Sequence, residues 1–140
     1  MPDDVILGKT AIIERWLRQV STYYRGHEAE VETDFMRQDA ILLNLQRAAE
    51  ASIDLAMHVV RVRGLGLPRD SREAFTLLET AALVDPETAR RMRAIVGFRN
   101  VAVHHYRPLD IGIVRDIIEH RQDDLLAFTR QMLGLADLAP

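Results

Sequence analysis

Residues 41–60 read ILLNLQRAAEASIDLAMHVV, and the spacing of apolar residues in this stretch indicates the fold class. Apolar side chains recur every three or four positions, at Leu42, Leu45, Ala49, Ile53, Ala56, Met57 and Val60. That period places them on one face of an α-helix, which we expect to run from about residue 33 to about residue 63. At about 1.5 Å per residue, the helix would be roughly 45 Å long. A small bundle needs a shorter helix than this. We therefore expect part of the helix to contact a second subunit and the protein to be a homodimer.

The same helical period continues on both sides of this stretch. Four further helices are expected, over about residues 4–24, from Ser71, from Asp85-Pro86 to the break at Arg107-Pro108, and from Asp110. Side chains suited to capping stand at their starts, namely Asp3 or Asp4, Ser71, Asp85 and Asp110, and Gly64 is placed to end the long helix in a left-handed conformation. No strand alternation persists. The sequence therefore predicts an all-α fold, an antiparallel helical bundle of about five helices in a single domain over residues 1–140.

The composition excludes several kinds of site. The chain has 140 residues and no cysteine, which excludes disulfides, zinc–thiolate sites and cysteine nucleophiles. No apolar stretch approaches the roughly 20 residues that span a bilayer, and the acidic N-terminus lacks the basic start of a signal peptide. We therefore expect a cytoplasmic protein without a membrane partner.

Positive charge is concentrated in one segment of an acidic chain. The formal net charge is −3, which argues against general affinity for nucleic acid. Residues 88–109 nevertheless hold five arginines and no acidic residue, the arginines being Arg90, Arg91, Arg93, Arg99 and Arg107. Because no carboxylate lies within this segment, we expect its arginines to be left without neutralising partners. Such a patch can hold one or a few phosphates rather than follow a long backbone.

Residues 98–106 read FRNVAVHHY and combine three groups suited to phosphodiester chemistry. Arg99 can hold a phosphate through two parallel hydrogen bonds and stabilise the charge of a pentacoordinate phosphorus. His104, with an ordinary pKa of about 6.5, can take the proton from a ribose 2′-hydroxyl or give one to the leaving oxygen. Asn100 shares a helix face with His104, and Tyr106 can donate a hydrogen bond. The motif has no carboxylate to bind a metal, so we expect RNA cleavage without a metal or a cofactor.

Other interpretations remain open at this stage. The spacing of Arg99 and His104 permits a cluster without forcing one, and a lone histidine at a helix end is ordinarily a cap. The neighbouring His105 could replace His104 as the base. The alternative functions are a non-catalytic nucleotide- or partner-binding helical subunit and a dimerisation bundle without a ligand. Trp16, Tyr23 and Tyr24 fit the core or an interface, while His27, His58, His105 and His120 fit the surface or packing.

The pattern Phe98-Arg99-Asn100-x-x-Val103-His104-x-Tyr106 resembles the signature of the HEPN superfamily, and most closely its HepT-like branch. The preceding stretches Gly66-Leu67-Pro68 and Ser71-Arg72-Glu73-Ala74-Phe75 are similar to that branch as well. The resemblance covers about residues 33–135 and is specific through residues 64–110. It implies an all-helical homodimer of HEPN type in which two copies of the motif meet across the subunit interface and line one cleft.

The resemblance also implies a function and a partner. Family members of this kind are metal-independent ribonuclease toxins of type VII-like toxin–antitoxin systems, paired with a minimal nucleotidyltransferase (MNT) antitoxin. Arg99 and His104 would be catalytic and Asn100 supporting, while Tyr106 would be both a supporting residue and the residue to which the antitoxin transfers AMP. Arg93 and Arg107 are candidate phosphate-binding residues. AMP on Tyr106 would add an anion close to Arg99 and Arg107, which is a plausible way to silence the site.

Overall fold

The computed structural model describes residues 2–104 and 110–137, and within residues 102–104 it describes the course of the helix only. Its first four helices are α1 (Asp4–Tyr24), α2 (Phe35–Val62), α3 (Ser71–Thr80) and α4 (Pro86–His104), with a short 3-10 turn, η1 (Glu28–Glu30), before α2. The C-terminal part is α5 (Ile111–Asp116), a π-helical turn η2 (Ile117–Arg121) and α6 (Gln122–Leu133). The described residues contain no strand, so the all-α prediction is confirmed. Because α5, η2 and α6 follow one another without a gap, the expected count of five helices is confirmed too.

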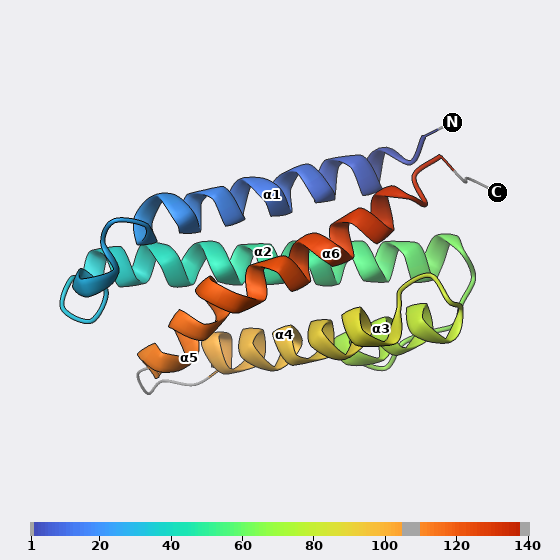
Figure 1. Ribbon diagram of the computed structural model, residues 1–140. Coiled ribbons are helices and arrows are strands. Elements are labelled where there is room, and N and C mark those ends of the chain that lie inside the picture. Colours follow the sequence, from blue (N-terminus) through green and yellow to red (C-terminus); the bar gives the residue numbers. More distant parts are fainter. Residues whose placement is uncertain (1, 105–109, 138–140) are drawn as a thin grey trace.

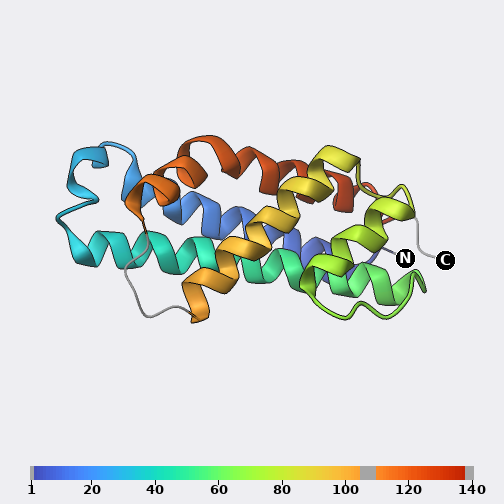
Figure 2. The same cartoon turned by 90° about the horizontal axis from the view of Figure 1, so that it is seen from below.

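The helices form an elongated bundle (Figure 1). The antiparallel helices α1 and α2 lie side by side along its length, α6 crosses in front of them, and α3 and α4 cover the opposite side of α2 from α1. Figure 2 shows α4 crossing α2 obliquely, so that the C-terminal half of α4 lies beside the middle of α2. None of the described helices is long and apolar enough to cross a membrane.

The ends of α2 follow from local side-chain chemistry. At its start the Asp34 carboxylate accepts a hydrogen bond from the backbone N–H of Arg37 at 3.1 Å. At its end Gly64 has φ +63°, and the backbone N–H groups of Gly64 and Leu65 donate to the carbonyls of Arg61 and Val60 at 3.2 and 2.9 Å. This pair of hydrogen bonds is the Schellman motif. It requires a left-handed backbone conformation, which glycine adopts easily because it has no Cβ. The prediction for Gly64 is confirmed.

One predicted cap is wrong, and the correction affects the site. The side chain that caps α3 is Asp70, which accepts the backbone N–H of Glu73 at 2.8 Å, rather than Ser71. The reason is conformational, since Asp70 is extended (φ −154°, ψ 177°) as a cap must be, whereas Ser71 is already the first helical residue. The hydroxyl of Ser71 is therefore released from capping. Asp85 caps α4 as predicted, accepting the N–H of Thr88 at 2.8 Å.

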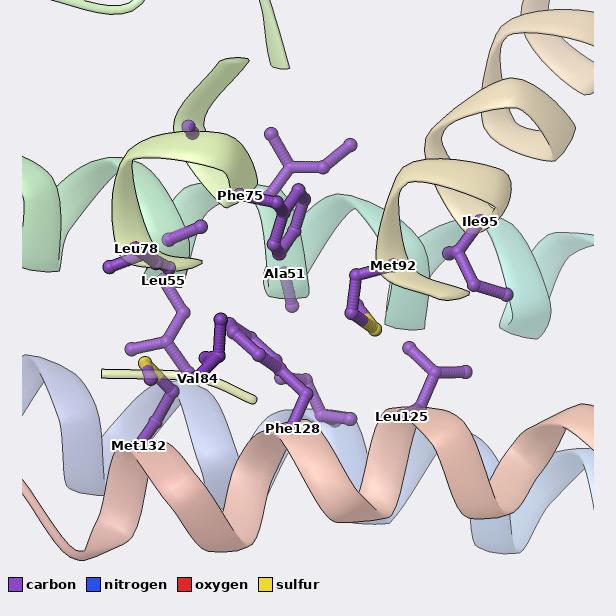
Figure 3. Packing of buried hydrophobic residues seen from close by; sticks show 14 of the residues in the cluster. Ala51, Leu55, Phe75, Leu78, Val84, Met92, Ile95, Leu125, Phe128 and Met132 are labelled. Atoms are coloured by element: carbon purple, nitrogen blue, oxygen red, sulfur yellow. The ribbon is translucent and has the colours of Figure 1, made fainter. Parts of the chain in front are cut away.

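Two apolar clusters fill the interior. The larger joins α1, α2, α3, α4 and α6, and in it the rings of Phe75 and Phe128 meet edge to face with centroids 5.3 Å apart (Figure 3). The smaller joins the C-terminal end of α1, the start of α2, and α5 with η2. The partly buried Phe98 packs against this smaller cluster. Because Phe98 directly precedes Arg99, this packing helps to fix where the motif leaves the core.

Tyr24 belongs to the smaller cluster, as its core interpretation required. It is buried, its hydroxyl is hydrogen-bonded to the carboxylate of Glu119, and the guanidinium of Arg115 lies 3.5 Å from the phenol oxygen. Burial, together with the hydrogen bond to Glu119, raises the pKa of Tyr24. The contact fastens the π-helical turn η2, which carries Glu119, to the end of α1.

Candidate functional site

Arg99, the arginine of the motif, is anchored by residues of two other helices. It lies on α4, its side chain is only 18% exposed, and its Nη1 donates to the Glu50 carboxylate of α2 at 2.8 Å. Its Nη2 donates to the hydroxyl of Ser71 at 3.2 Å, while its Nε is buried and has no hydrogen-bond partner among the described residues. Three helices therefore determine the position of this one guanidinium.

The local sequence explains why the three helices can meet. Ser71 is free to accept from Arg99 because Asp70 supplies the cap of α3. Arg72 reaches across α4, where its Nε lies 3.4 Å from the carbonyl of Arg93. A Cβ built on Gly97 would lie 2.8 Å from Nη2 of Arg72, so glycine at this position leaves room for the arginine.

A hollow of about 250 Å³ lies beside Arg99. It is lined by the first residues of α3 and by one side of α4, namely Asp70, Ser71, Arg72, Val96, Arg99 and Asn100. The guanidinium groups of Arg72 and Arg99 and the amide of Asn100 are donors suited to phosphate oxygens. The carboxylate of Asp70 is committed to its cap. The hollow is small enough to hold one phosphate group rather than a length of nucleic acid.

The structure places some of the predicted site residues and not others. Arg99 and Asn100 line the same hollow. The helix α4 reaches His104, but the side chain of His104 lies outside the described part of the structure. His105, Tyr106 and Arg107 also lie outside the described residues. Their roles stay predictions.

For the arginines of residues 88–104, which the structure describes, the expectation that they lack neutralising partners is wrong. Glu87, just before the segment, pairs with both Arg90 and Arg91 at 2.7 Å. The more distant acids come from other helices, since Arg91 also pairs with Asp124 at 3.4 Å. The inference failed because the absence of acids was counted along the chain, whereas α2, α3 and α6 pack against α4 and bring their own carboxylates.

Arg93 shows the same effect at a residue predicted to bind phosphate. Its Nη1 pairs with the Glu79 carboxylate of α3 at 3.0 Å and lies 3.4 Å from the hydroxyl of Thr76. In this arrangement Arg93 joins α3 to α4. A phosphate at Arg93 would have to compete with the carboxylate of Glu79. The phosphate-binding role of Arg93 stays a prediction.

Sequence reasoning missed two partners of the motif, Glu50 and Ser71. Glu50 lies 49 positions before Arg99, and nothing in the helical period of α2 distinguishes it from a solvated glutamate. Ser71 was interpreted as a cap, which hid its free hydroxyl. The only sequence signal for Glu50 is an acidic residue next to the apolar stripe of α2, and that signal is weak.

A second and larger pocket, of about 440 Å³, lies between α4 and the α5–η2 segment. Its apolar wall includes Ile95, Phe98 and Ile117, and three arginines stand at it, Arg90, Arg91 and Arg121. These arginines are engaged by carboxylates, with Arg121 3.5 Å from Asp116. Asp116 is thus part of a surface ion pair. Burial raises the pKa of Asp124, which also lines this pocket, above its ordinary value.

Comparisons with known proteins agree on one family. A family model described as ribonuclease HepT-like matches residues 13–132. The mRNA nuclease HepT of Shewanella oneidensis is 38% identical over 126 residues, which cover 90% of this chain and 94% of that protein. A tri-AMPylated HEPN toxin of Shewanella oneidensis, solved in complex with an MNT antitoxin, has a TM-score of 0.89 and 36% identity over 94% of this chain and 98% of its own. A toxin–antitoxin structure with AMP-PNP gives the same TM-score and identity, over 94% of this chain and 99% of that one.

Proposed function

The chain belongs to the HepT-like ribonuclease family, and from this premise we propose that it is an RNA endonuclease and the toxin of a type VII-like toxin–antitoxin pair. The resemblance of the chain to the HepT-like branch is thereby confirmed, and the roles of residues 98–106 are part of the proposal. The observation that carries the proposal is the anchoring of Arg99 by Glu50 and Ser71 beside a hollow that fits one phosphate. Because residues of three helices fix the guanidinium of Arg99, its remaining N–H groups are held in one position, where they can bind a phosphate in a defined orientation.

The proposed reaction is an attack of the ribose 2′-hydroxyl on the adjacent phosphorus. The 2′-oxygen–phosphorus bond forms, the bond from phosphorus to the 5′-oxygen breaks, and the products are a 2′,3′-cyclic phosphate and a 5′-hydroxyl. His104 takes the proton of the 2′-hydroxyl, and an imidazolium returns a proton to the leaving 5′-oxygen. The remaining N–H groups of Arg99 stabilise the additional negative charge of the pentacoordinate phosphorus, and this step uses no metal.

Glu50 and Ser71 would act through Arg99. A guanidinium has five N–H donors, of which Glu50 and Ser71 engage one each, leaving others for a phosphate. Because two anchors fix its plane, Arg99 loses less conformational entropy when a phosphate binds. Glu50 also offsets the charge of Arg99 in the absence of RNA. Asn100 lies on the same side of α4 and would orient the phosphate or the imidazole.

The first test compares single substitutions with matched controls. We expect Arg99→Ala and His104→Ala to lower the rate of RNA cleavage by roughly 10²- to 10³-fold and to remove toxicity when the gene is expressed alone. The controls are Arg90→Ala, on the same helix, and His120→Ala, on η2. They remove an arginine and a histidine from the surface outside the motif and should leave the rate unchanged. Circular dichroism establishes that each variant folds. If the two motif variants cut RNA as fast as the wild type, the assigned site is wrong.

Regulation by the partner is tested separately. We propose that a minimal nucleotidyltransferase antitoxin binds this chain and transfers AMP to Tyr106, and that the active form is a homodimer. Co-expression with the nucleotidyltransferase should add one or more AMP masses to the intact chain and abolish cleavage. The variant Tyr106→Phe should lose the AMP at that position. An unmodified chain that is nevertheless silenced by the partner would contradict this mode of control.

A further inference from the structure

The only tryptophan of the chain, Trp16, lies between two arginines on a different part of the bundle from the motif. The guanidinium carbon of Arg15 is 5.1 Å from the centre of the Trp16 ring, and that of Arg47 is 4.8 Å from it. Arg15 and Trp16 are on α1, whereas Arg47 is on α2. Trp16 is half-buried and packs against the larger apolar cluster, so the ring is a fixed platform. We call Arg15, Trp16 and Arg47 the Arg–Trp cluster.

The cluster differs in its charge balance from the described arginines of α4. Within residues 2–104 and 110–137, no carboxylate forms an ion pair with Arg15 or Arg47, whereas Arg90, Arg91, Arg93 and Arg99 all have one. Both guanidinium groups are on exposed residues, and the π-face of Trp16 holds them. Their N–H donors are therefore fixed in place and available. Unneutralised donors on an aromatic platform are the recurring composition of sites that bind single-stranded nucleic acid.

The cluster is connected along α2 to Glu50, the partner of Arg99. Arg47 precedes Glu50 by three residues, which is less than one turn and about 4.5 Å along the helix axis. Residues at this spacing lie on neighbouring parts of one helix face. Glu50 in turn holds Arg99 at 2.8 Å. Glu50 and Arg47, both on α2, thus link Arg99 on α4 to Trp16 on α1.

We propose that the Arg–Trp cluster is a second RNA-binding site, which holds phosphates of the substrate strand outside the motif. This inference rests on the proposed ribonuclease function and adds to it a track along which the strand lies. Arg15 and Arg47 bind the phosphates, and Trp16 keeps the two guanidinium groups in place and offers its edge to a base. The site is independent of base identity, because it contacts phosphates and an aromatic surface.

A second copy of the chain is the competing occupant of this face. In a symmetric dimer the same surface patch of both subunits meets at the twofold axis. A dimer contact centred on the Arg–Trp cluster would place it against its own copy, and four unneutralised guanidinium groups would repel one another. A polyanion removes that repulsion. The charge of the cluster therefore favours RNA over a dimer contact centred on the cluster.

The experiment uses Trp16 itself as the reporter. The probe is a short single-stranded RNA in which every 2′-hydroxyl is methylated, so that the proposed nucleophile is absent and the probe is not cut. Titration of the dye-labelled probe into the wild-type protein, with anisotropy and tryptophan fluorescence read in parallel, should give a change in Trp16 emission that follows binding and is reversed by salt. Binding without any change in Trp16 emission overturns the proposal.

The matched variants test the charge. Arg15→Gln/Arg47→Gln should weaken probe binding on the order of tenfold at low salt and reduce the slope of log affinity against log salt by about 1.4, or about 0.7 for each lost phosphate contact. Arg25→Gln/Arg130→Gln makes the same change in net charge at exposed positions elsewhere, and should alter neither quantity. Equal losses in both double variants mean that only net charge matters, which overturns the proposal. A change in sedimentation from dimer to monomer in the first variant also overturns it, in favour of a subunit interface.

Cleavage of ordinary RNA separates this inference from the function on which it rests. If the wild-type protein neither binds nor cuts RNA, both the ribonuclease proposal and the inference about the Arg–Trp cluster are wrong. If the wild type cuts RNA and Arg99→Ala does not, the ribonuclease proposal stands. In that case unchanged probe binding by Arg15→Gln/Arg47→Gln ends the inference about the Arg–Trp cluster alone.

Discussion

The two ends of α4 hold the same residue type in different ways. Near its start, the side chain of Arg90 is 65% exposed and pairs with Glu87, less than one turn away. Near its other end, the side chain of Arg99 is 18% exposed and pairs with Glu50, 49 positions away in the chain. A local pair on the surface contributes little, whereas a long-range pair fixes one helix against another. An arginine is therefore part of a site because of its neighbours in space rather than its neighbours in sequence.

Among the substitutions that compare the two ends of α4, the largest effect is expected from one that keeps the charge of Arg99 and changes its shape. Lysine ends in a single ammonium and cannot make two parallel hydrogen bonds to a phosphate while it contacts Glu50 and Ser71. Arg99→Lys should therefore lower the initial rate of cleavage of labelled RNA by about 10²-fold. Arg90→Lys, at the opposite end of the helix, should leave the rate unchanged. Equal rates for the two variants would remove the distinction between the ends of α4.

The next effect comes from removing the long-range partner. Glu50→Ala frees the guanidinium of Arg99 to adopt several positions, so the rate of RNA cleavage should fall about tenfold. Because Glu50 is 47% exposed, the free energy of unfolding should fall by only about 1 kcal/mol. Glu87→Ala removes the local partner of Arg90 and should not affect the rate. Glu50→Asp should restore part of the lost activity, which a role in folding alone would not predict.

A smaller effect, on stability, is expected at the cap of α4. The backbone N–H of Thr88, with further hydrogen bonds from the Thr88 hydroxyl and Gln131, lowers the pKa of Asp85 although partial burial opposes this. The pKa of Asp85 is therefore lower in the folded state than in the unfolded state. The contribution of the ionised cap to the free energy of unfolding is complete above the ordinary aspartate pKa and is lost as the pH falls through the folded value. Asp85→Ala should cost about 1 kcal/mol at neutral pH and less in acid. Urea unfolding at neutral pH and at about pH 3 measures the difference, and a cost independent of pH would contradict it.

The smallest effect is expected at the local ion pair. Arg90→Gln breaks the contact with Glu87, but both side chains are more than half exposed to water. Water and salt screen such a pair, so the urea midpoint should not change measurably. A clear loss of stability would show that the start of α4 depends on its ion pairs, and would make the two ends of the helix alike.

The features that sequence could predict are local ones. The helical period of residues 41–60, the left-handed Gly64 and the cap at Asp85 depend on residues within a few positions of one another. Even local rules failed where the sequence offered two candidates or an unusual residue. Asp70 rather than Ser71 caps α3, and α3 ends in a second Schellman motif whose left-handed residue is Ala82, at φ 59°. Alanine gives no signal of that conformation.

The candidate site was only half accessible from sequence. The motif names Arg99 and Asn100, and both line the hollow beside α3. Their surroundings are set by packing between helices, so the ion pair to Glu50 and the hydroxyl of Ser71 could not be derived from spacing. The same holds for the Arg–Trp cluster, where Arg15 and Arg47 are brought together by the contact of α1 with α2. Charge counted along a chain therefore predicts an electrostatic site poorly.

We propose that this chain cuts RNA by attack of the 2′-hydroxyl, with Arg99 and His104 as the catalytic residues. The most direct measurement is the chemistry of the new ends after purified protein is incubated with labelled RNA in excess EDTA. Cleavage that persists in EDTA and leaves 2′,3′-cyclic phosphate and 5′-hydroxyl ends, and that stops in His104→Ala, is the predicted result. Cleavage that requires a divalent metal, or that leaves 3′-hydroxyl and 5′-phosphate ends, would contradict the account.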